Sequence, residues 1–204
     1  RDIESSWAGV RPLIYEEGKE PSEVSRKDEI WQSESGILTI AGGKLTGYRK
    51  MAEEIVDIVV KQLKVEYGRT YRKCVTKRLS ISGGELNGSK YFDEFVKRKT
   101  AVGQELGLSF AEAERLAQFY GTNVEKVFAF VEEDSALPGY LQGQLRYSIL
   151  YESVMKPVDF FVRRTGYLLF NIPLVECFND LVIVELAKQL RWSHKQRARY
   201  PHEL

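Results

Sequence analysis

The turn Gly42-Gly43-Lys44-Leu45-Thr46 has the residue types of a site that holds an anion or a polarised ring. Two glycines let the backbone bend sharply and approach a ligand closely. The segment after the turn has helical periodicity, so the first amides of that helix and its positive dipole end would face the ligand. By itself the pattern fits an ordinary strand–turn–helix connection equally well.

The elements on either side of the turn are predicted from their apolar residues. The run at 37–41 is continuously apolar, which is typical of a parallel strand covered on both faces. Beyond Met51, apolar residues share one helical face while charged residues occupy the other. The apolar positions are Ala52, Ile55, Val56, Val59 and Leu63. A strand and a helix therefore present the turn.

Several segments, taken with this turn, resemble the FAD-dependent glycerol-3-phosphate dehydrogenases and the related glycerophosphate oxidases. They are WAGVRPLI at 7–14, SRKD at 25–28, SG at 35–36 and GGKLTGYRKMA at 42–52. Their order and spacing also match those of the family. The resemblance is specific over residues 5–60 and continues more loosely to the C-terminus.

The resemblance implies an enzyme that oxidises sn-glycerol 3-phosphate to dihydroxyacetone phosphate, with hydride transfer to FAD and electrons passed to a membrane quinone. It places the cofactor-binding residues in the turn, beneath the flavin: Gly42, Gly43, Lys44, Leu45 and Thr46. It also assigns substrate binding to Arg11 and Lys44.

Arg11 suits a phosphate because a guanidinium fork matches phosphate oxygens bidentately, and the following Pro12 would restrict the backbone. From the residues alone, without the resemblance, a surface arginine at the end of a strand is the favoured interpretation of Arg11. We assign no catalytic base, because none is identifiable here, and expect that group upstream of residue 1.

The glycine fingerprint of a dinucleotide-binding fold, G-x-G-x-x-G, occurs nowhere in the 204 residues. We therefore expect a C-terminal piece of a longer enzyme that neither binds FAD nor is active alone. Residues 1–66 are predicted to be the end of an FAD- and substrate-binding domain whose folding depends on absent partners. Residues 67–204 are predicted to form an α-helical C-terminal domain.

Composition excludes several classes of protein. With 30 Lys and Arg against 29 Asp and Glu, the net charge is +1, so no basic field favours nucleic acid. No apolar run approaches the length of a membrane-spanning helix. Cys74 and Cys177 provide no disulfide framework and suit a reducing cytoplasm, and Cys177 is predicted to lie in the core. His194 and His202 lack the clustered ligands of a metal site.

The fold class predicted is mainly α: a bundle of about six helices after a partial α/β segment of strands and one helix. Helix starts are predicted from capping signals at Ser89, Ser109, Thr122, Asn171 and Ser193, with Pro157 in the first turn of another helix. One further helix is predicted over 144–155, after a loop at 134–143. The aromatic core candidates are Phe92, Phe95, Phe119, Phe128, Phe161 and Phe178.

Alternatives remain for the function of the helical half. It could be a non-catalytic module that mediates interaction, homodimerisation or membrane docking, with 188–199 as the candidate basic face. The enzyme could also be an oxygen-using glycerophosphate oxidase.

Arg163 and Arg164 fit an anion site, but a helix-end pair interacting with Asp159 and Glu152 is the simpler interpretation. By resemblance, the enzyme is expected in the cytoplasm, peripheral at the inner face of the cell membrane.

Overall fold

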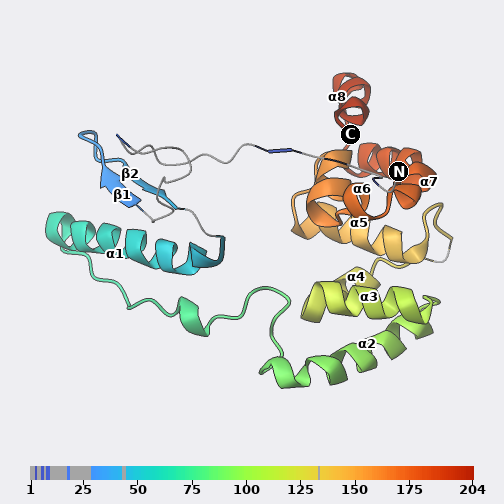
Figure 1. The fold of residues 1–204 in the computed structure, drawn as a ribbon, viewed down its shortest axis with the longest axis horizontal. Coiled ribbons are helices and arrows are strands. Elements are labelled where there is room, and N and C mark those ends of the chain that lie inside the picture. Colours follow the sequence, from blue (N-terminus) through green and yellow to red (C-terminus); the bar gives the residue numbers. More distant parts are fainter. Residues whose placement is uncertain are drawn as a thin grey trace. The chain divides into compact units, whose positions relative to one another are not determined.

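The computed structural model describes residues 29–42, 45–132 and 134–204, together with Ile3, Ser6, Ala8, Gly9 and Gly18. The chain separates into two compact units, which divide between Leu79 and Ser80. We call the unit Ala8–Leu79 the N-terminal unit, and the unit that contains Ser80–Leu204 the helical unit (Figure 1). The domain boundary at 66/67 stays a prediction from sequence.

The N-terminal unit contains a two-stranded hairpin followed by one long helix. Strand β1 (Glu29–Gln32) pairs with β2 (Leu38–Ala41), and Ile30 lies opposite Ile40. The strand predicted at 37–41 is therefore present, but its predicted parallel pairing is wrong, because β1 and β2 are antiparallel. The connection between the two strands is too short for the crossover that parallel neighbours require.

Helix α1 (Tyr48–Tyr67) confirms the helix predicted after the turn. It ends at Gly68, whose left-handed conformation (φ 65°) lets the chain leave the helix. No residue of α1 is buried, and Val56 and Val65 are 54% and 86% exposed. The apolar face of α1 is thus only partly covered within its own unit.

Hydrogen bonds from the side chains of Gln62 and Arg49 hold α1 to the rest of its unit. Gln62 Nε2 donates to Gln32 Oε1 of β1 at 2.7 Å. The Arg49 guanidinium donates to the carbonyl of Thr76 and, at 2.9 Å, to that of Leu79, which fixes a 3₁₀ turn (Thr76–Arg78) beside the start of α1. The segment after α1 therefore runs back along the helix.

The helical unit confirms the mainly α fold class. Its α-helices are α2 (Phe92–Glu105), α3 (Phe110–Tyr120), α4 (Val124–Phe128), α5 (Gly139–Tyr151), α6 (Tyr167–Phe170), α7 (Ile172–Gln189) and α8 (His194–Arg199). Short 3₁₀ turns occur at Ser89–Tyr91, Gly121–Asn123 and Tyr200–Glu203, and a π-helix spans Asp159–Arg164. The number of α-helices in the helical unit is close to the predicted six, since α4 and α6 are little longer than single turns.

Three of the predicted helix caps are confirmed. Ser109 and Ser193 form complete capping boxes with Glu112 and Gln196, and the Asn171 side chain accepts the amide of Leu174. The other two predicted caps, at Thr122 and Ser89, are wrong.

At Thr122 the hydroxyl is occupied elsewhere, because it donates to the Glu85 carboxylate. Helix α4 consequently begins without a side-chain cap, and it is a short helix that ends at Phe128. Ser89 lies inside a 3₁₀ turn, and α2 begins at Phe92, also without a side-chain cap.

Helix α5 corrects the loop predicted at 134–143. The two glycines that suggested a loop instead permit close packing. A Cβ on Gly143 would lie 2.8 Å from the Val127 carbonyl oxygen, and one on Gly139 would lie 3.0 Å from Val131 Cγ1. At Gly143 the backbone oxygen leaves no room for a Cβ, and at Gly139 the contact with the Val131 side chain would be tight. Helix α5 therefore packs closely on α4 and the segment after it, and it begins at Gly139.

The core of the helical unit consists of two hydrophobic clusters, one on α2–α4 and one on α5–α7 with the π-helix. Phe95, Phe128 and Phe161 are buried as predicted, and Phe92 and Phe178 pack against the clusters. Two predictions are wrong: Phe119 is 55% exposed, and the Cys177 thiol is exposed on α7. The apolar periodicity of these helices does not specify their exact rotation toward the core.

Three buried polar side chains connect the two clusters. Gln144 Nε2 donates to the Tyr120 hydroxyl at 3.3 Å, and the Tyr167 hydroxyl donates to Gln144 Oε1 at 2.7 Å. Gln144 and Tyr167 are only 3% and 1% exposed. Burial raises the pKa of both Tyr120 and Tyr167, so both phenols stay protonated at neutral pH.

We expect Gln144→Leu to lower the free energy of unfolding by about 1–3 kcal/mol, because it leaves two buried hydroxyls without their amide partner. Chemical denaturation of the chain measures the change. Gln118→Leu, on the exposed side of α3, is the matched control and should change little. Equal stabilities for wild type and Gln144→Leu would contradict a contribution from this bridge.

Candidate functional site

The described part of the glycine turn lies on the surface of the N-terminal unit. Gly42 and Thr46 are exposed, and Leu45 is 90% exposed at the start of a 3₁₀ turn (Leu45–Gly47) that leads into α1. Three of the predicted site residues, Arg11, Gly43 and Lys44, lie outside the described residues. The described residues of the turn lie between β2 and α1, as the sequence predicted, and are exposed.

The first turn of α1 keeps its hydrogen-bond donors free of side-chain caps. Gly47 at the N-cap position makes no capping hydrogen bond, and the first turn contains no acidic residue. With no acidic side chain in its first turn, this end of the helix keeps its positive dipole, which favours an anion or a negatively polarised ring edge. These properties fit the pattern expected beneath a flavin.

Arg49 is a residue whose role sequence reasoning missed. Its guanidinium also donates from Nε to the Tyr48 hydroxyl at 3.1 Å, in addition to the carbonyls of Thr76 and Leu79. Those carbonyls belong to backbone about 30 positions later, and nothing in the local sequence marks them. Arg49 therefore fixes the start of α1 against the segment at 76–79.

A hollow of about 400 Å³ lies between α1 and the segment at 71–76. Ala52, Val56 and Val60 supply its apolar side, and the exposed Cys74 lines the opposite side. The Cys74 thiol has a polar neighbour, since its Sγ lies 3.1 Å from Thr76 Oγ1. In the described part of the chain, no group of three or more His, Cys, Asp or Glu could hold a metal ion.

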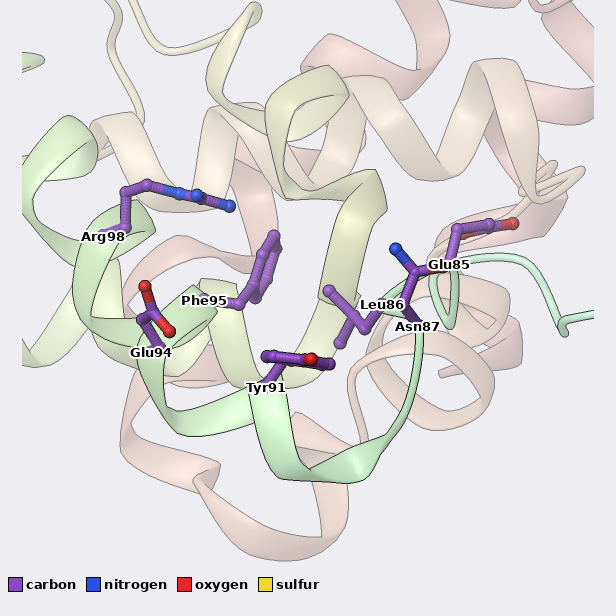
Figure 2. Close-up of a pocket in the computed structure, with 7 residues that line it drawn as sticks. All are labelled: Glu85, Leu86, Asn87, Tyr91, Glu94, Phe95 and Arg98. Carbon is purple, nitrogen blue, oxygen red and sulfur yellow. The ribbon is translucent and has the colours of Figure 1, made fainter.

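The helical unit has its own surface hollow, of about 390 Å³, between the loop at 85–87 and α2 (Figure 2). Leu86, Tyr91 and Phe95 form its apolar side, with Glu94 and Arg98 at the rim. Glu85 points away, and hydrogen bonds from Thr122 and the Gly83 amide lower the pKa of its carboxyl. The lining pairs no nucleophile with a base, so we assign it no catalysis.

The π-helix gives the predicted Arg163–Arg164 pair a structural explanation. Arg163 forms an ion pair with Asp159 one turn earlier, and Asp159 Oδ2 accepts the amides of Met155 and Lys156 at 3.0 Å each. The predicted partner Glu152 instead accepts the Ser148 hydroxyl. Arg163 therefore stabilises the start of this segment.

Comparison with known proteins relates these features to a family. Residues 74–197 match the family described as the C-terminal domain of alpha-glycerophosphate oxidase. The chain belongs to this family. The matched segment covers most of the helical unit and the end of the segment that Arg49 holds.

Two curated relatives match the whole chain. The aerobic glycerol-3-phosphate dehydrogenase of Staphylococcus haemolyticus is 52% identical over 207 residues, and that of Staphylococcus aureus (strain USA300) is 53% identical over 207 residues. Each alignment covers 100% of this chain and 37% of the relative. The chain thus spans little more than a third of the length of these curated relatives.

A solved structure agrees with the sequence relatives. The glycerol-3-phosphate dehydrogenase from Bacillus halodurans, determined in complex with FAD, matches with a TM-score of 0.79 and 40% identity. The match covers 86% of this chain and 36% of that one. The resemblance predicted from the sequence is confirmed by these relatives, whereas the roles of individual site residues stay predictions.

Proposed function

We propose that this chain is part of an FAD-dependent enzyme that oxidises sn-glycerol 3-phosphate to dihydroxyacetone phosphate. The observation that carries the proposal is 52% identity along the whole chain to a protein named aerobic glycerol-3-phosphate dehydrogenase. The sequence identity extends through both units, which supports the proposal that both belong to this enzyme.

In this proposal the turn after β2 holds the cofactor. Gly42, Gly43, Leu45 and Thr46 would contribute backbone amides and a hydroxyl, and the uncapped start of α1 would add a favourable dipole. When bound, the flavin supplies the acceptor for the hydride from C2 of the substrate. The exposure of Gly42, Leu45 and Thr46 supports such a role.

Arg11 and Lys44 would bind the substrate phosphate. A guanidinium gives two parallel hydrogen bonds to phosphate oxygens, whereas a lysine ammonium contributes a compact point charge. Lys44 lies within the turn, so it would also stabilise negative charge that develops on the cofactor edge. Their task is to orient the substrate and neutralise its charge.

We further propose that quinone is the electron acceptor and that the enzyme docks peripherally on the inner face of the cell membrane. Supporting this, exposed cations gather at the end of α7 and on α8, at Lys188, Arg191, Lys195 and Arg197. Helix α8 buries none of its residues. Within the described ranges, no helix has the length and apolar character needed to cross a bilayer.

The choice between dehydrogenase and oxidase is tested by the acceptor. We expect the full-length enzyme to reduce a soluble quinone analogue with sn-glycerol 3-phosphate and to form hydrogen peroxide at least about tenfold more slowly in air. The measurement compares quinone reduction with peroxide release at saturating substrate. Stoichiometric peroxide with slow quinone reduction would instead identify an oxygen-using oxidase.

A further inference from the structure

The C-terminal residues 193–204 form a small folded segment of the helical unit. Helix α8 closes its own start with the capping box of Ser193 and Gln196, and it buries none of its residues. It extends beyond the other helices of the helical unit (Figure 1). After α8 the chain returns, and Tyr200 and Leu204 pack against the larger hydrophobic cluster, the one on α5–α7 and the π-helix. We call residues 193–204 the C-terminal strap.

Trp192 lies at the point where the strap covers this cluster. The residue is 5% exposed, and its ring meets the Tyr200 ring edge-to-face, with 5.1 Å between centroids and 89° between planes. Among the described residues, its buried Nε1 has no hydrogen-bond partner. A buried donor without a partner has lost its bonds to water without compensation. Exposure of Trp192 to water therefore costs less than exposure of a core side chain whose polar atoms are all paired.

The backbone between α7 and the strap has an unusual conformation at Arg191. Its φ of 50° lies in the left-handed region, which residues other than glycine rarely adopt. This conformation ends α7, because the Trp192 amide turns back and donates to the Ala187 carbonyl at 3.1 Å. Helices usually have glycine at such a position. A rotation at Arg191 would relieve the unfavourable conformation and would also move the strap, so Arg191 is a natural hinge.

Lys156, from the segment before the π-helix, holds the far end of the strap. Its Nζ donates to Glu203 Oε2 at 2.6 Å and also lies 5.0 Å from the centroid of the Tyr200 ring. The other charged group facing the Glu203 carboxylate is Arg199 of α8, whose Nε lies 2.8 Å from Oε1. Lys156 and Glu203 are 30% and 25% exposed at their side chains, so solvent reaches this ion pair. One carboxylate thus joins the strap to the body of the helical unit.

We propose that the C-terminal strap opens about Arg191 when Glu203 loses its charge, which uncovers Trp192 and this end of the larger hydrophobic cluster. The hydrogen bond and charge of Lys156 lower the pKa of the Glu203 carboxyl from its ordinary value of 4.5. The carboxylate is therefore ionised at neutral pH and the strap is closed. Its contribution is lost as the pH falls below 4.5, through the lowered pKa.

Acrylamide quenching of Trp192 fluorescence tests the proposal in the 204-residue chain, with Trp7→Phe and Trp31→Phe removing the other two tryptophans. At pH 7 we expect Glu203→Gln to raise the quenching constant about threefold or more, because chain ends open locally at little cost in free energy. Glu176→Gln is the matched control. Glu176 is exposed on α7 and forms no ion pair within the described part of the chain, so quenching should stay within about 1.5-fold of the parent.

Two further measurements separate loss of the ion pair from a general loosening. Lys156→Met should raise quenching as Glu203→Gln does, and the double variant should add little, because both changes remove the same interaction. As the pH falls from 7 to about 3, quenching of the parent should rise until it meets that of Glu203→Gln. Far-UV circular dichroism should keep its helical signal throughout, since only the strap opens.

Each of the following results would overturn the proposal. Quenching at pH 7 is unchanged by Glu203→Gln, or the Glu176→Gln control raises it equally. The effects of Lys156→Met and Glu203→Gln add in full, or the parent and Glu203→Gln stay apart as the pH falls. Quenching rises only together with loss of the helical signal, which would mean global unfolding instead of an opening strap.

Discussion

Replacing Arg11 with Lys in the full-length enzyme is expected to lower kcat/KM for sn-glycerol 3-phosphate by about 10- to 150-fold. The substitution keeps the positive charge but removes the planar fork that pairs with two phosphate oxygens at once. The loss corresponds to ~1.5–3 kcal/mol, the range for a charge-assisted hydrogen bond. Steady-state kinetics measures it directly.

Unphosphorylated glycerol distinguishes phosphate binding from a general defect. Its much lower kcat/KM should change less than about threefold in the Arg11→Lys variant, because it has no phosphate for the fork. Arg69→Lys, an exposed arginine beside the Tyr67 ring, is the matched control and should behave as wild type. An unchanged kcat/KM for the phosphate ester would remove Arg11 from the site.

Truncation of Phe160 to Ala should lower the free energy of unfolding by about 3–5 kcal/mol. Phe160 is 0% exposed in the π-helix and packs edge-to-face on Phe161 at 5.3 Å between ring centroids. Removing the ring leaves a cavity in the larger hydrophobic cluster. A loss of that size approaches the whole stability of a typical domain, so poor soluble expression is an additional expected result.

Phe170→Ala is the control for this truncation. It makes the same chemical change at a residue that is 86% exposed, so we expect a change within about 0.5 kcal/mol. Chemical denaturation followed by circular dichroism reports both variants. Similar losses in the two variants would contradict the assigned position of Phe160 in the core.

Local signals in the sequence predicted the parts of the fold whose interactions are local. The boxes at Ser109 and Ser193 close on residues three positions later, so a capping motif contains both partners. Thr122 has the same motif with Glu125, but its hydroxyl binds Glu85, which is far away in the sequence. A tertiary hydrogen bond outcompetes the cap, and no local pattern reports it.

Glycines show the same difference between local interactions and interactions of distant segments. Gly68 after α1 is a helix stop of the common left-handed kind, which needs no partner from a distant segment. Gly139 and Gly143 lie inside α5 because Val131 and Val127 approach closely, which depends on the packing of neighbouring helices. Composition alone therefore suggested a loop there.

For the candidate site, the sequence predicted a strand and a helix on either side of the turn, because strand, glycines and helix are contiguous. It could not predict the antiparallel partner of β2, nor the backbone carbonyls that Arg49 binds. Those depend on where separate segments meet in space.

Anaerobic titration of the full-length enzyme with sn-glycerol 3-phosphate tests the central claim most directly. The account predicts that the absorbance of the bound flavin bleaches with one equivalent of substrate per flavin, with dihydroxyacetone phosphate formed in the same amount. Because no acceptor is present, the result depends only on the substrate and on the enzyme with its bound cofactor. A flavin that dithionite reduces but sn-glycerol 3-phosphate leaves oxidised would contradict the account.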